Sequence, residues 1–267
     1  MPVHLVRAVL LTQAALLLVV GSGFLLGAGW AHRLWPWPDG RLSYLFVASM
    51  MLAQAGSVAW VALTLELQAV RGGLIGFAAS AIGIAAYAIG SQGASPNPAL
   101  WPWAGAGIVM AAGSVGLLLI SPRFPIRDHR LSPPVVRLSF LVFAIALAVA
   151  TAMLLARQTV VFPWPLKPGS SVIFGFLFLA SAIYFFHGWL KPGVSNASGQ
   201  LIGFLIYDLV LIPPFVLHWP KTEGPFRVSM GIYLVVLFWS AALALWFLPR
   251  HALPWRKRQG SAPKQDR

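Results

Sequence analysis

One carboxylic acid lies deep inside an apolar segment of this sequence. Asp208 stands about ten residues into an apolar block over residues 199–219, or about 15 Å along a helix. A charge at that depth is costly, so an intramembrane acid indicates a functional group unless a neighbouring helix satisfies it. Pro213 and Pro214 follow it and should disturb the helix, freeing backbone carbonyls. The pattern predicts either a proton or cation site or a protonated carboxyl that hydrogen-bonds to another helix.

Four other polar side chains accompany this acid in the sixth and seventh apolar blocks. Ser181 and Tyr184 should lie at a similar depth, and Tyr207 is its neighbour in sequence. His187 lies about a turn inside the end of the sixth block, where an interfacial hydrogen-bonding role is the alternative. The resulting hypothesis is a ligand or ion path formed by Asp208, Tyr207, Ser181, Tyr184 and His187.

Two loops share a Pro-Trp-Pro core. Trp35-Pro36-Trp37-Pro38 returns as Phe162-Pro163-Trp164-Pro165, and a third loop contains Trp101-Pro102-Trp103. Tryptophan favours the boundary between membrane and water, and proline directs the helix that follows it. We expect an interfacial aromatic motif, with a cap over an outward-facing pocket as the alternative. Its residues are Trp35, Trp37, Trp101, Trp103, Phe162 and Trp164.

The sequence offers little other chemistry. It has no cysteine and only six acids, and no His-x-x-x-His or Glu-x-x-His pair provides two ligands for a metal. It contains no phosphate-binding loop, dinucleotide fingerprint or Gly-x-Ser-x-Gly elbow. We therefore predict no catalytic residues, no metal and no cofactor, which argues against an enzyme without excluding one.

The elements that must position these residues are membrane-spanning helices. The chain is 58% hydrophobic and 9% charged, against about 25% charged in soluble domains. Its apolar residues form eight continuous blocks, each long enough for a helix of about 20 residues to cross a bilayer. The expected spans are 6–30, 42–65, 72–92, 99–121, 134–157, 170–190, 199–219 and 228–248. The fold class is therefore an all-α integral membrane protein.

The chain also repeats itself at an offset of 127 residues without a gap. Residues 72–77 return at 199–204, and 13 of the 43 pairs aligned from residue 35 to residue 77 are identical. Four spans per unit return the chain to the side where it began, which predicts two parallel repeats about a pseudo-twofold axis along the membrane normal. The expected domains are a first repeat (1–121), a basic cytoplasmic linker (122–133), a second repeat (134–249) and a disordered basic tail (250–267).

The basic residues predict the orientation. If the N-terminus is cytoplasmic, 13 of the 19 Lys and Arg residues fall on that side, so the positive-inside rule places both termini in the cytoplasm of a bacterial inner membrane. The tail should be drawn to anionic lipid headgroups. Because the excess of basic residues lies in loops and tails, orientation explains it better than nucleic-acid binding. The expected partners are the lipid bilayer, anionic headgroups and other membrane subunits.

The second loop motif carries one resemblance. The stretch from Phe162 to Pro168 resembles a Trp-Pro-Trp-x-Leu-x-Pro segment of uncharacterised bacterial multi-span membrane proteins, which implies no activity. The scarcity of polar groups favours an accessory or structural subunit of a membrane assembly. A transporter or channel for a small or apolar solute, with Asp208 as the coupling residue, is the alternative. A membrane enzyme acting on lipid is the third.

Overall fold

The chain is almost entirely helical, as a computed structural model of residues 3–37, 39–93, 96–158 and 160–252 shows. Eight of the described helical segments are long and apolar enough to cross a membrane, which confirms an all-helical membrane protein. The first half contains α1 (Val3–Leu26), α2 (Gly29–Arg33), α3 (Arg41–Thr64), η1 (Leu67–Val70), α4 (Arg71–Gly90), η2 (Pro98–Leu100), α5 (Trp101–Ile120) and η3 (Ser121–Arg123). The second half contains α6 (Pro134–Leu155), α7 (Pro168–Leu190), α8 (Val194–His218), η4 (Trp219–Lys221) and α9 (Gly224–His251).

Three boundaries differ from the sequence prediction. The first span ends at Leu26, because Gly27 adopts a φ of 73° and turns the chain into the short helix α2. The seventh span begins earlier than expected, because Ser198 and Asn196 return hydrogen bonds to backbone carbonyls and so fit into the helix. The prolines at 213 and 214 do not break α8, which is assigned as one helix to its end.

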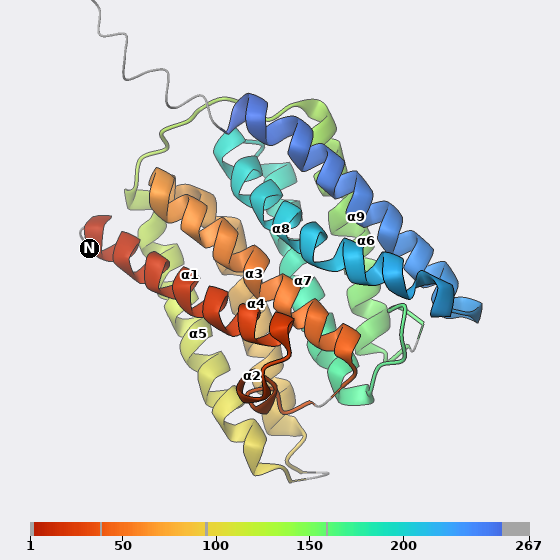
Figure 1. Ribbon diagram of the computed structural model, residues 1–267. Helices are drawn as coiled ribbons and strands as arrows, with labels where there is room; N and C mark the ends of the chain where they lie inside the picture. The colour runs from red at the N-terminus through yellow and green to blue at the C-terminus, as the bar shows by residue number, and fades with distance from the viewer. Residues whose placement is uncertain (1–2, 38, 94–95, 159, 253–267) are drawn as a thin grey trace, which may run out of the picture.

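The spans form two rows of four. In the first row α1 packs on α3, α3 on α8, and α8 on α9; in the second, α6 packs on α7, α7 on α4, and α4 on α5. Each row therefore joins a hairpin from the first half of the chain to one from the second. In Figure 1 the orange α3 accordingly lies beside the cyan α8, although they are far apart in sequence.

Glycines allow the central helices of each row to approach closely. A Cβ atom on Gly203 of α8 would lie 3.2 Å from the carbonyl oxygen of Ala53 in α3, and one on Gly76 of α4 would overlap the carbonyl of Ala180 in α7. Small residues bring membrane helices together in this way. The sequence Gly-x-Leu-Ile-Gly, at residues 72–76 and 199–203, thus packs one row at each of its occurrences.

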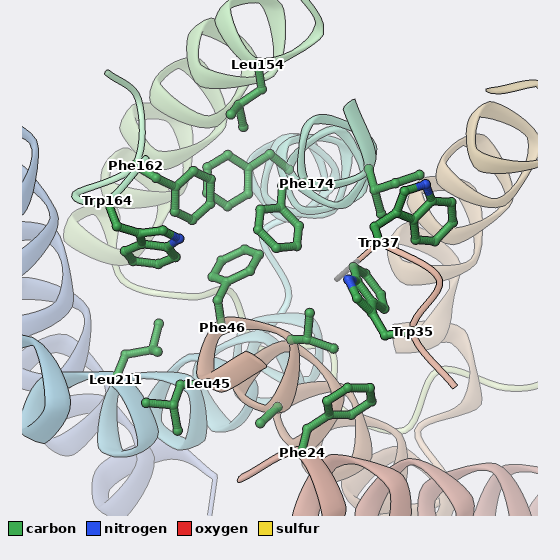
Figure 2. Packing of buried hydrophobic residues seen from close by; sticks show 14 of the residues in the cluster. Phe24, Trp35, Trp37, Leu45, Phe46, Leu154, Phe162, Trp164, Phe174 and Leu211 are labelled. Carbon is green, nitrogen blue, oxygen red and sulfur yellow. The ribbon is translucent and has the colours of Figure 1, made fainter. Parts of the chain in front are cut away.

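An aromatic core lies where the loops after α2 and α6 fold between the helices. Phe46 of α3 is at its centre, with ring centroids 4.8 Å from Phe174 and 4.9 Å from Phe162 (Figure 2). Trp164 donates its indole hydrogen to the Ser43 hydroxyl at 2.8 Å. The two loops therefore hold the rows together through buried rings.

The segment between the halves crosses the other end of the helices. The Ser132 backbone donates to the Pro192 carbonyl at 2.7 Å, and the Arg130 side chain donates to the His251 carbonyl at 3.1 Å. Gln68 donates to the Phe124 carbonyl. The start of α1 and the end of α9 lie at this same end, because Val6 packs with Leu67 and Phe124 in one cluster. The expected disordered tail after residue 252 lies outside the described residues.

Candidate functional site

A cavity of about 1540 Å³ lies between the two rows, and residues from all eight spans line it. It reaches from α1 and α5 at one edge to α6 and α9 at the other. Most of the wall is aliphatic or aromatic. None of the lining side chains that the structure describes is charged. Such a space accepts an uncharged, apolar molecule and would penalise a bare ion.

Most of the hydroxyl groups on the wall already donate to the protein. Ser57 donates to the Gly199 carbonyl at 2.8 Å, Ser114 to Met110 at 2.8 Å and Ser181 to Leu177 at 3.2 Å. These bonds leave the serine hydrogens unavailable to a ligand. They also explain how polar side chains remain inside an apolar wall.

The predicted path residues divide into two groups. Ser181, Tyr184 and Tyr207 line the cavity, whereas Asp208 and His187 do not. The Tyr184 hydroxyl is hydrogen-bonded to Ser57, which connects α7 with α3 across the two rows. The structure thus brings three of the five residues to one space.

Asp208 is completely buried between α8 and α9. The hydroxyl of Ser240 lies 2.9 Å from Oδ1 and 2.8 Å from Oδ2 of the carboxyl group. The same hydroxyl lies 2.9 Å from the Val236 carbonyl oxygen, so Ser240 bonds both the acid and its own helix. This geometry matches the hydrogen-bonded carboxyl that the sequence left open, and it places the acid away from the cavity wall.

His187 lies at the contact between α7, α4 and α8. Its ring fills the space over Gly72, where an added Cβ would be 2.7 Å from Nδ1, and the Asn196 amide nitrogen is 3.3 Å from that same Nδ1. Within the described part of the chain, no three His, Asp or Glu side chains are grouped closely enough to hold a metal ion. The histidine therefore acts as a packing and hydrogen-bonding group.

The expected interfacial aromatics occupy two environments. Four rings are buried in the aromatic core: Trp35, Trp37, Phe162 and Trp164. By contrast Trp101 is 55% exposed, and Trp103 donates its indole hydrogen to the Leu34 carbonyl at 3.1 Å. The buried four brace the loops against the helices.

The sequence reading missed three polar residues on the cavity wall. Tyr233 of α9 bonds to the Tyr207 hydroxyl, and Gln13 and Gln54 project from α1 and α3. Their signal was present, because each is a polar residue inside a long apolar block. Attention to acids and histidines alone passed over them.

One buried acid lies outside the spans. Glu66 follows α3 and accepts the backbone N–H of Arg127 at 3.4 Å. Burial raises the pKa of this carboxyl above its ordinary value, and the nearby Asp128 adds to the rise, while the hydrogen bond and the charge of Arg127 oppose it. Asp128 itself pairs with Arg130 at 2.6 Å.

No model of a known protein family, no curated protein and no solved structure matches this chain. The function must therefore be argued from the cavity and its residues.

Proposed function

We propose that this protein is a membrane carrier that holds an uncharged, largely apolar molecule between its two rows of helices. One observation carries the proposal: the cavity touches all eight spans, and its described lining contains no charged side chain. Its volume exceeds the roughly 300–1,000 Å³ of an ordinary small-molecule pocket. A lipid-sized solute fits such a space better than an ion or a sugar.

The proposed carrier is built from two parallel repeats offset by 127 residues. Contacts between the halves support this, because they occur at equivalent positions. Gly203 meets Ala53 as Gly76 meets Ala180, and in each pairing the second contact is displaced by 127 residues from the first. Gly199 likewise lies against Trp60, the position equivalent to that of His187 over Gly72. Transporters with repeats of this kind place their sites at the interface between repeats.

The proposed setting is a bacterial inner membrane with both ends of the chain in the cytoplasm. The distribution of Lys and Arg supports this orientation, with the basic linker on the same side as the termini. The proposed contact of the tail with anionic headgroups rests on its Lys and Arg residues.

An accessory subunit of a larger membrane assembly is the second candidate. It is favoured by α9, which exposes Phe238 and Trp239 together with Trp246 on the outside of the first row. Aromatic side chains of this kind are common in protein interfaces. In that case a partner helix would cover α9.

Native mass measurement of the tagged protein, purified from its own membrane in mild detergent, tests the two candidates. The carrier proposal expects the chain to retain a non-protein molecule of a few hundred daltons that leaves on gentle activation. Recovery with a fixed set of other subunits, and no small molecule, would replace the carrier by the accessory subunit.

A further inference from the structure

Two tyrosine hydroxyls form a polar point in the cavity wall. Tyr207 of α8 and Tyr233 of α9 both line the cavity and are hydrogen-bonded to each other. Among the described residues neither hydroxyl has another hydrogen-bond partner. When two hydroxyls share one hydrogen bond, only one of their two hydrogens is used. The pair therefore keeps one donor for a third group.

The surroundings of this pair are apolar and aromatic. Phe46 and Phe204 lie 6.2 Å and 6.4 Å from the Tyr207 ring, and Phe215 lies 5.3 Å from the Tyr233 ring. A hydrogen bond is stronger in such an environment than in water, and an unused donor there is unfavourable. An oxygen atom on a bound molecule would satisfy this donor.

We infer that the Tyr207–Tyr233 pair recognises the oxygen-bearing end of a long apolar molecule, with a hydroxyl, ether or carbonyl oxygen accepting the free tyrosine hydrogen. The hydrocarbon chain of this molecule occupies the uncharged remainder of the cavity. The inference rests on the proposed carrier function and adds to it the class of molecule carried.

The other free polar groups lie on α1 and α3. The amides of Gln13 and Gln54 line the cavity, and neither takes part in a hydrogen bond between described residues. They are the rival binding point. The aromatic enclosure favours the tyrosines, and Gln54 supplies a matched comparison inside the same cavity.

Binding of three radiolabelled probes to the protein in lipid nanodiscs tests the inference. Phytol, phytyl methyl ether and the hydrocarbon phytene have similar branched chains and differ at the polar end. The wild-type protein should bind the alcohol and the ether about fivefold more tightly than the hydrocarbon, which is the effect of roughly one hydrogen bond. Tyr207→Phe with Tyr233→Phe should abolish that preference without weakening phytene binding. Each single substitution keeps one hydroxyl and should reduce the preference less, which provides a test if the double variant does not fold.

Two control substitutions complete the design. Tyr87→Phe removes a hydroxyl outside the cavity lining, and Gln54→Met removes an amide within it; both should retain the full preference. Equal binding of all three probes to the wild type, or loss of the preference in Gln54→Met alone, would overturn the tyrosine inference and leave the carrier intact. Absence of specific binding of any probe would count against the carrier function itself.

Discussion

At the scale of single residues, the structure separates the buried acid from the cavity. Asp208 is satisfied by Ser240, whereas its neighbour Tyr207 faces the open space. Adjacent positions on α8 thus have different roles because they point to different neighbours. The acid joins two helices, and the tyrosine presents a hydroxyl to a ligand.

Substitutions at this pair separate a structural acid from a coupling acid. Ser240→Ala should destabilise the protein by about 1–3 kcal/mol, because it leaves a buried carboxyl without its donor. Asp208→Asn, which retains a hydrogen-bonding side chain of the same size, should bind the phytol probe within about twofold of the wild type. Thermal unfolding in detergent and probe binding measure the two effects. Loss of binding in a fully stable Asp208→Asn protein would instead return the acid to the ligand path.

At the scale of elements, the rows depend on glycines at particular contacts. Gly203→Ala should lower the unfolding temperature by several degrees, because the new methyl group would press on the Ala53 carbonyl and push α8 from α3. Gly105→Ala is the matched control, since a Cβ there meets nothing within 4 Å. It should be neutral or stabilise α5 by up to about 1 kcal/mol through helix propensity. Equal destabilisation by both changes, measured by thermal unfolding, would contradict the close contact.

The loop between α3 and η1 should respond to pH through Glu66. Burial raises its pKa in the folded protein, so folding favours the protonated form. The resulting stability is present below the unfolded pKa and is lost as the pH rises through the folded value. Glu66→Gln should therefore gain stability relative to the wild type as the pH increases from about 4 towards neutrality. Thermal unfolding of both proteins across that range measures this, and parallel pH profiles would contradict it.

How far the sequence predicts these elements depends on the range of the interactions. Apolar length alone predicted eight spans, since crossing a bilayer requires it. The turn at Gly27 was missed because a positive φ is a local feature inside a continuous apolar run. The partnership of Asp208 with Ser240 spans 32 residues, and the bond between Tyr207 and Tyr233 joins separate helices, so neither follows from spacing within one span.

At the scale of the whole molecule, the account requires hairpins from the two halves to share each row. The natural chain contains no cysteine, so engineered pairs report proximity without background. Gly72→Cys with His187→Cys should form a disulfide between α4 and α7, because a Cβ at position 72 would lie 2.9 Å from that of His187. Gly203→Cys with Ser57→Cys should join α8 to α3 in the other row.

A negative control uses the same cysteines. Ser57→Cys with Gly72→Cys combines α3 and α4, which belong to different rows, and should not cross-link under the same mild oxidation. Gel mobility after oxidation in native membranes measures all three pairs. Cross-linking of the control pair at the same rate would contradict the arrangement in two rows.

The most direct test of the central claim is an electron microscopy map of the protein in nanodiscs of its native lipids, with a bound antibody fragment for alignment. The account predicts elongated non-protein density between the rows, with its polar end beside Tyr207 and Tyr233. A cavity closed by movement of the rows, or one filled by the helix of another subunit, would contradict the proposal that this protein carries an apolar molecule.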